Sequence, residues 1–129
     1  MKTKLWACLE LIRVGNLFSA AADVLAGYYL ASAFVGSTTN EAGLPLLILS
    51  SVCLYAGGVA LNDVCDADRD AVERPSRPIP SGRVSRASAA RLAVTLLGIG
   101  TIAAMTVSLR ATVLAGTLVA AIALYNVHA

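Results

Sequence analysis

The sequence contains little charge. Only 14% of the residues are Asp, Glu, Lys or Arg, against ~25% in typical soluble domains, whereas 57% are hydrophobic and the mean hydropathy is +0.73. A soluble domain of this length needs polar residues along its helices to cover its surface. The scarcity of charge therefore argues against a soluble domain and favours a membrane protein.

Residues suited to several kinds of metal and redox site are also scarce. The only histidine is His128, next to the last residue, and the three cysteines Cys8, Cys53 and Cys65 form no C-x-x-C pair. The sequence therefore predicts no zinc site, no disulfide framework and no histidine-based catalytic dyad. A net charge of +2 is too small to indicate a nucleic-acid partner.

Four apolar stretches are present instead. They cover residues 14–35, 44–61, 89–109 and 111–127. Each can cross a bilayer core as a helix, which takes ~17–25 residues. The fold class predicted is an all-α, polytopic transmembrane bundle of about four helices, forming a single membrane domain over residues 1–129. Glu10 and Arg13 interrupt the first apolar run early, which predicts an interfacial helix at the N-terminus rather than a cleaved signal peptide.

The distribution of basic residues predicts the orientation of this integral membrane protein. The N-terminal segment and the polar segment 62–88 hold nearly all of the Lys and Arg residues, whereas the predicted exposed loop 36–43 holds none. By the positive-inside rule, the N-terminus and segment 62–88 lie in the cytoplasm. An even number of spans returns the C-terminus to the same side.

The polar segment opens with a dense group of oxygen ligands. On a continuing helix, Asn62, Asp66 and Asp70 are four residues apart and line one face, whereas Asp68 lies ~160° from Asp70 and points away. Asp63 adds a fourth carboxylate, and crowded carboxylates favour a divalent cation. Oxygen ligands suit Mg²⁺, which proteins often hold together with substrate phosphates.

The segment has two other interpretations. Composition alone is equally compatible with a solvated surface loop. The spacing of Asp66, Asp68 and Asp70 is also that of an EF-hand start, but Ala71 stands where glycine is needed and Arg77 where a bidentate glutamate is needed. The EF-hand interpretation is therefore rejected.

A family resemblance favours the metal site. The pattern N-D-x-x-D-x-x-x-D at 62–70, followed by R-P-S-R-P-I-P-S-G-R-V-S at 74–85, resembles the first aspartate-rich motif and following loop of the UbiA superfamily of intramembrane prenyltransferases. Less specifically, Arg13 and Asn16 resemble an Arg-x-x-Asn seen early in many members.

The resemblance implies a nine-helix fold around a central cavity, of which this chain is similar to the N-terminal part. It implies Mg²⁺-dependent transfer of a prenyl group from a polyprenyl diphosphate to an aromatic or other lipophilic acceptor within the membrane lipid. The implied catalytic residues are Asp66 and Asp70. The implied metal ligands are Asn62, Asp66 and Asp70, with Asp63 as a weaker candidate. The implied diphosphate-binding residues are Asn62, Arg77, Arg74 and Arg13.

Several of these residues have equally simple structural explanations. Arg74 also fits a topology signal, and Arg13 fits an interfacial anchor. Asp23, inside the first span, either contacts an acceptor in the cavity or hydrogen-bonds a neighbouring helix, and the second role is favoured. The three prolines at 75, 78 and 80 predict a stiff loop that ends the helix and covers the site.

The resemblance covers about the first four of nine helices. The second aspartate-rich motif is absent, because Glu73 is the only acidic residue after Asp70. The sequence therefore predicts a fragment, a truncated product, or a half completed by a second chain. The competing function is a non-catalytic small membrane protein that retains the motif by descent. A transporter half or channel ranks last, because the spans 89–109 and 111–127 offer little beyond Thr and Ser as uncharged polar residues.

Overall fold

The computed structural model describes residues 2–35 and 41–128, and within them every regular element is helical. A 3-10 turn at Glu41–Gly43 precedes the second long helix. The helices are α1 (Lys2–Leu11), α2 (Val14–Val35), α3 (Leu44–Cys65), α4 (Ala67–Glu73), α5 (Arg86–Val107) and α6 (Leu109–His128). The prediction of an all-α fold is confirmed.

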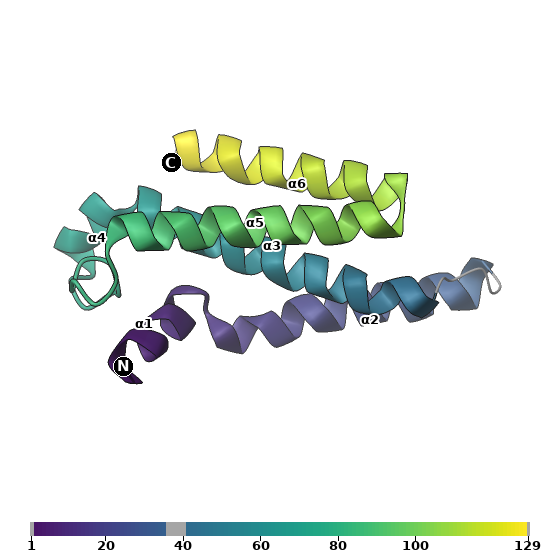
Figure 1. Cartoon of the computed structure of the whole chain (residues 1–129), viewed down its shortest axis with the longest axis horizontal. Helices are drawn as coiled ribbons and strands as arrows, with labels where there is room; N and C mark the ends of the chain where they lie inside the picture. Colours follow the sequence, from purple (N-terminus) through teal and green to yellow (C-terminus); the bar gives the residue numbers. More distant parts are fainter. Residues whose placement is uncertain (1, 36–40, 129) are drawn as a thin grey trace.

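The four long helices α2, α3, α5 and α6 lie side by side and alternate in direction (Figure 1). All four are long and apolar enough to cross a membrane. They correspond to the four predicted spans, although α3 continues to Cys65, α5 runs from Arg86 only to Val107, and α6 already begins at Leu109. Residues 36–40 of the predicted exposed loop lie outside the described residues.

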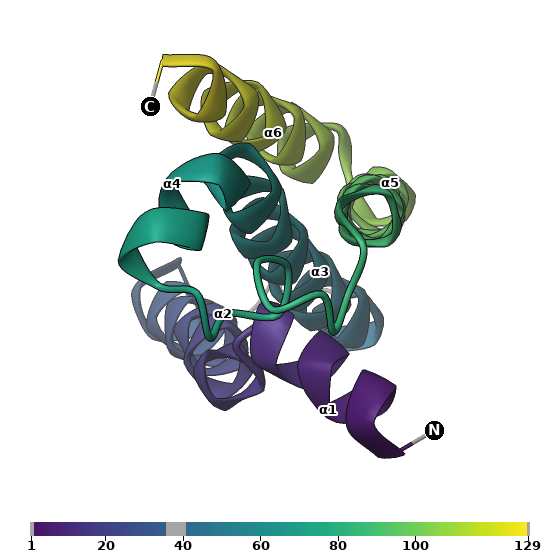
Figure 2. The same cartoon turned by 90° about the vertical axis from the view of Figure 1, so that its left-hand side faces the viewer.

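Helix α3 occupies the centre and packs against α2, α5 and α6 (Figure 2). Its approach to α5 is close because glycines face the interface. A Cβ built on Gly57 would lie 2.8 Å from Leu97 Cγ and 3.0 Å from the Ala93 carbonyl oxygen, and one on Gly100 would lie 2.8 Å from Leu54 Cγ. Small residues let membrane helices approach closely and gain van der Waals contact, which explains this packing.

One end of the bundle carries α1, α4, the loop 74–85 and the C-terminal end of α6 (Figures 1 and 2). Helix α1 contacts this end through two fully buried side chains, Ala7 and Leu11. They belong to a cluster with Ala60, Val84, Ala89 and Ala93. The first helix, the central helix and the end of the loop thus share one small core.

The loop 74–85 folds back on the bundle. Pro78 is buried, and its carbonyl accepts a hydrogen bond from the Val84 N–H at 3.0 Å. The reversal passes through Gly82, whose φ of +73° is a conformation that residues with a Cβ rarely adopt. Ser85 then caps α5, its hydroxyl accepting from the Ser88 N–H at 3.2 Å.

Candidate functional site

The motif residues lie on a helix that is almost continuous. Helix α3 ends at Cys65, Asp66 forms a turn, and α4 begins at Ala67. Backbone hydrogen bonds continue across the turn, from the Asp66 N–H to the Asn62 carbonyl at 2.9 Å and from the Asp70 N–H to the Asp66 carbonyl at 2.8 Å. The helical spacing assumed from the sequence therefore holds approximately through the motif.

Asp63 and Asp70 form the buried side of this helix, with side chains only 8% and 4% exposed. They are seven residues apart, which places them within ~20° of each other around a helix. A single guanidinium nitrogen, Arg77 Nη1, lies 2.5 Å from Asp70 Oδ2 and 3.2 Å from Asp63 Oδ1. The fold of the loop thus places the guanidinium of Arg77 beside the two carboxylates of the motif.

A second cation reaches the same place from the N-terminal side. Arg13 Nη2 lies 3.6 Å from Asp63 Oδ1, so Asp63 is shared between two arginines. Arg13 stands in the break between α1 and α2 and has a φ of +50°, in the left-handed region. The break turns α1 toward α3 and the end of the loop 74–85, and Arg13 at the break, a residue of the predicted diphosphate set, lies beside the Asp63 carboxylate.

Asn62 and Asp66 form a separate pair on the neighbouring side. Asn62 Nδ2 donates to Asp66 Oδ2 at 2.7 Å, and both residues are half-buried. The structure thus differs from a single row of Asn62, Asp66 and Asp70. The physical reason is the ~40° drift at each four-residue step, which separates the ends of that row by ~80° and aligns Asp63 with Asp70 better.

The remaining motif residues lie outside the cluster. Asp68 is exposed and pairs with Arg86 at 3.1 Å, so it points away from the other carboxylates, as its helical position predicts. Arg74 ends α4 as an exposed residue, its backbone N–H donating to the Asp70 carbonyl at 2.8 Å. Of the predicted arginines, the structure brings Arg77 and Arg13 to the carboxylates and leaves Arg74 on the surface.

A second ion pair fixes the loop that carries Arg77. Arg83 Nη1 and Nη2 donate to the two Glu10 carboxylate oxygens at 2.6 and 3.1 Å, and Nη2 also donates to the Ser76 carbonyl at 2.6 Å. Hydrogen bonding from Arg83 holds the pKa of Glu10 below its ordinary value. These two residues are 73 apart in sequence, and no local pattern indicates their contact.

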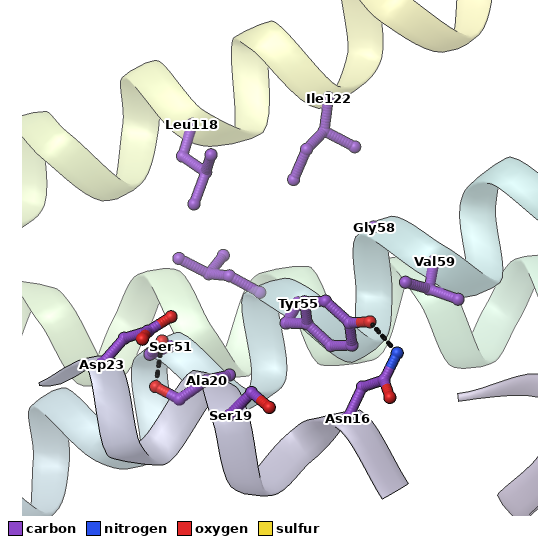
Figure 3. A pocket seen from close by; sticks show the side chains of 11 residues that line it. Asn16, Ser19, Ala20, Asp23, Ser51, Tyr55, Gly58, Val59, Leu118 and Ile122 are labelled. Carbon is purple, nitrogen blue, oxygen red and sulfur yellow. Dashed lines mark hydrogen bonds between the residues drawn. The ribbon is translucent and has the colours of Figure 1, made fainter. Parts of the chain in front are cut away.

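Two hollows lead from the motif along α3, between α2 and α6. The one at the motif end, about 510 Å³, is lined by Arg13, Asn62 and Asn126 among others. The inner one, about 640 Å³, is lined mainly by apolar groups together with Ser51, Tyr55 and Asp23 (Figure 3). Asp23 therefore faces a hollow, although no residue there identifies an acceptor.

Polar contacts fix one wall of the inner hollow. Asn16 Nδ2 donates to Tyr55 Oη at 3.0 Å, and Ser51 Oγ donates to the Ala20 carbonyl at 3.1 Å (Figure 3). Both contacts join α2 to α3. Asn16, the second residue of the predicted Arg-x-x-Asn, thus lines the hollow and ties the two helices together.

The donor set at the motif fits a hard cation. It consists of carboxylate and amide oxygens, and Mg²⁺ commonly takes one or two carboxylates with substrate phosphates supplying further ligands. In the described part of the chain, no three His, Cys, Asp or Glu side chains are gathered around one point. Asp66 and Asp70, the predicted ligands, can supply two carboxylates.

Comparison with known proteins identifies relatives of the whole arrangement. The model of the UbiA prenyltransferase family matches residues 21–129, which include the motif and the loop. The digeranylgeranylglyceryl phosphate synthase of Sulfolobus acidocaldarius is 40% identical over 96 residues, covering 74% of this chain and 34% of that protein. The synthase of Ignicoccus hospitalis is 41% identical over 97 residues, covering 75% and 30%.

A solved structure agrees with these matches. It comes from work on the biosynthesis of digeranylgeranylglyceryl phosphate synthase in membranes, and it superposes with a TM-score of 0.88 at 29% identity. The alignment covers 98% of this chain and 44% of that one. The chain spans about a third of the length of the curated relatives that it matches.

Proposed function

The chain belongs to the UbiA prenyltransferase family, and from this premise we propose that it binds a polyprenyl diphosphate and supports transfer of the prenyl group to a lipophilic acceptor. The observation that carries the proposal is the position of the charged cluster. Arg13, which pairs with Asp63, lines the motif-end hollow together with Asn62, and the hollow next to it along α3 is mostly apolar. Arg77 joins Asp63 to Asp70 beside it. A molecule with a charged head and a long apolar tail has this distribution of polarity.

The reaction breaks the allylic C–O bond between the prenyl group and the diphosphate. The diphosphate leaves with the bonding electrons, the acceptor atom bonds to the allylic carbon, and the acceptor loses a proton. The similar proteins are named for a glyceryl phosphate that carries two geranylgeranyl groups. We therefore favour a glyceryl phosphate alcohol as the acceptor, which gives an ether, over an aromatic ring.

The residues of this chain contribute mainly electrostatics. In this proposal Arg77 and Arg13 donate charge-assisted hydrogen bonds to the departing diphosphate, whose negative charge grows as the bond breaks. Bound at Asn62, Asp66 and Asp70, with Asp63 as a weaker candidate, Mg²⁺ would neutralise the same charge. Asp66 and Asp70 are the residues that we assign to catalysis.

Release of diphosphate from geranylgeranyl diphosphate tests the proposal. The chain is assayed in membranes with and without Mg²⁺, alone and beside the C-terminal helices of a digeranylgeranylglyceryl phosphate synthase. We expect Mg²⁺-dependent release in at least one arrangement. A chain that neither releases diphosphate nor binds Mg²⁺ more tightly when diphosphate is present would instead be a non-catalytic member that retains the motif by descent.

We further propose that the motif end of this integral membrane protein faces the cytoplasm. Of the ten Lys and Arg residues, only Arg110 lies at the opposite end of the bundle. The test replaces the three native cysteines and introduces single cysteines at Ser81 or at Glu41. An impermeant thiol reagent applied to intact cells should label position 41 only, and labelling at position 81 would reverse the orientation.

A further inference from the structure

Arg83 binds three different partners through its guanidinium group. Its Nη1 and Nη2 atoms donate to the carboxylate of Glu10 on α1, at 2.6 and 3.1 Å. Nη2 also donates to the Ser76 carbonyl at 2.6 Å, and Nε donates to Ser81 Oγ at 3.0 Å. Every nitrogen of the group is therefore engaged. Figure 2 shows α1 beside the loop 74–85, the two segments that Arg83 joins.

The two loop contacts of Arg83 flank Arg77. The Ser76 carbonyl belongs to the peptide group that precedes Arg77 in the chain. The carbonyl of Arg77 itself accepts from the Ser81 hydroxyl at 2.6 Å and from the Ser81 N–H at 3.0 Å. Arg83 therefore holds the backbone on both sides of the Arg77 Cα, directly at Ser76 and indirectly through Ser81. Because each peptide group is planar, fixing both groups fixes the direction in which the Arg77 side chain leaves the backbone.

The other end of the Arg77 side chain is held at the motif. Its Nη1 atom contacts the carboxylates of Asp63 and Asp70. A long side chain loses rotamer freedom when a ligand fixes it, and this loss opposes binding. Since the fold of the loop already restricts Arg77, less freedom remains to be lost when its guanidinium meets a diphosphate.

We propose that Arg83 and Ser81 are positioning residues for Arg77. This inference rests on the proposed function, in which Arg77 donates to the diphosphate, and it adds the residues that orient this donor. Neither Arg83 nor Ser81 needs to contact the diphosphate. Because Glu10 anchors the Arg83 guanidinium on α1, the N-terminal helix takes part in orienting Arg77.

Binding of inorganic diphosphate in the presence of Mg²⁺ tests the proposal without requiring turnover. The whole chain in lipid nanodiscs is titrated by calorimetry, and its thermal unfolding is followed in parallel. Lysine at position 83 keeps the positive charge, but its single nitrogen cannot serve all three partners. In Arg83→Lys the dissociation constant for diphosphate should therefore rise about fivefold, as expected when one or two hydrogen bonds are lost.

A double-mutant cycle separates positioning from a general effect on the fold. If Arg83 acts through Arg77, Arg83→Lys should change the diphosphate affinity of an Arg77→Ala protein by less than about twofold. The melting temperature should fall on Arg83→Lys substitution in both backgrounds, because the loop loses contacts either way. A residue with only a structural role would weaken diphosphate binding in both backgrounds.

Ser81→Ala tests the indirect contact. It removes the hydroxyl that joins Arg83 to the Arg77 carbonyl and leaves the ion pair with α1 in place. The dissociation constant should rise about twofold to threefold, because the Ser81 N–H still donates to the same carbonyl. This small change keeps the test decisive if Arg83→Lys is not inserted into the membrane.

Arg86→Lys is the matched control. It makes the same substitution at an arginine whose Nη1 atom alone contacts the exposed Asp68, at 3.1 and 3.3 Å. Lysine can replace a contact made by one nitrogen, and neither residue touches the network around Arg77. The diphosphate affinity of Arg86→Lys should therefore equal that of the wild-type protein.

The outcomes separate this inference from the proposed function. An equal loss of diphosphate affinity from Arg83→Lys with and without Arg77→Ala would overturn the positioning role, because Arg83 would then act by another route. Unchanged affinity in both Arg83→Lys and Ser81→Ala would also overturn it. Either result leaves the proposed function standing. A wild-type chain that does not bind diphosphate with Mg²⁺ would overturn the proposed function, and this inference with it.

Discussion

The motif end and the spanning part of the bundle are built by different interactions. At the motif end, charged groups meet specific partners, as Arg77 does with Asp63 and Asp70. In the spanning part, α3 and α5 meet through small residues such as Gly57, whose packing has no charge and little direction. The comparison teaches that binding chemistry and helix packing are carried by separate residues, so substitutions should affect one without the other.

The largest expected effect is on activity, from Asp66→Asn or Asp70→Asn. Each change keeps the side-chain size and removes one negative charge, so turnover should fall at least ~10²-fold, as when one transition-state-stabilising group is removed. Diphosphate release measures it, with membrane insertion checked in parallel. Asp68→Asn is the matched control and should stay within about twofold, because its pair with Arg86 is exposed. If Asp68→Asn reduced turnover as much, the description of the site as one helical face would be wrong, and a loop wrapped around the metal would describe it better.

Arg77→Lys should have an intermediate effect. Lysine keeps the positive charge but loses the planar group that donates several hydrogen bonds to phosphate oxygens. We expect kcat/KM for the prenyl diphosphate to fall about tenfold, with most of the loss in kcat, because the interaction strengthens as the bond breaks. Arg74→Lys, at an exposed position, is the control and should change neither constant appreciably. If Arg74→Lys were the more damaging of the two, the diphosphate would bind at the surface end of the loop.

Gly57→Ala tests the other region and should affect stability. The new methyl group would meet backbone atoms of α5, the Ala93 carbonyl oxygen and the Leu97 nitrogen, both at 3.0 Å. We expect the free energy of unfolding to fall by about 1–3 kcal/mol, as overpacking commonly causes. Thermal unfolding in detergent measures it.

Gly98→Ala is the control for that experiment. A Cβ at Gly98 meets no atom within 4 Å, so alanine should be neutral or raise stability by up to ~1 kcal/mol through its helix propensity. If Gly57→Ala lowered the free energy of unfolding while Gly98→Ala raised it, the close approach of α3 to α5 would account for the difference. Equal effects would show that the close approach of α3 to α5 does not control stability.

The smallest expected effect is a pH dependence of the mobility of the loop 74–85. Because Arg83 depresses the pKa of Glu10 in the folded state, the ion pair contributes fully above the ordinary value of 4.5 and is lost as the pH falls through the folded pKa. A spin label at Ser76→Cys, in a protein without other cysteines, should become more mobile on acidification below about pH 4.5. In Glu10→Gln it should be mobile at every pH, whereas Glu73→Gln should behave as wild type.

The spanning helices could be predicted from the sequence, because their signal is local. A mainly apolar stretch such as residues 14–35, even with Asp23 inside it, determines both the element and its length, and α2 has those bounds. The motif could also be placed at the end of α3, since its spacing is helical. Hydropathy and spacing act over a few turns, which is the range that sequence reasoning covers well.

The partners within the candidate site could not be predicted in the same way. The four-residue spacing of Asn62, Asp66 and Asp70 predicts one row, whereas in the structure Asp63 shares the buried side of the helix with Asp70. The return of Arg77 to this face depends on how the proline loop folds. That fold depends in turn on the pair of Arg83 with Glu10, which is distant in sequence. Such contacts are decided by three-dimensional packing rather than by composition.

Arginine at position 13 lowers the stability of the turn, but it places a positive charge beside Asp63. A non-glycine residue with a φ of +50° costs roughly 1–2 kcal/mol, so glycine at this position would make the turn less strained. Glycine would also remove the second cation beside Asp63. Laboratory selection for stability alone should therefore favour Arg13→Gly, whereas selection for binding of an anion should retain arginine. The identity of residue 13 in evolved populations would show which of the two pressures dominates.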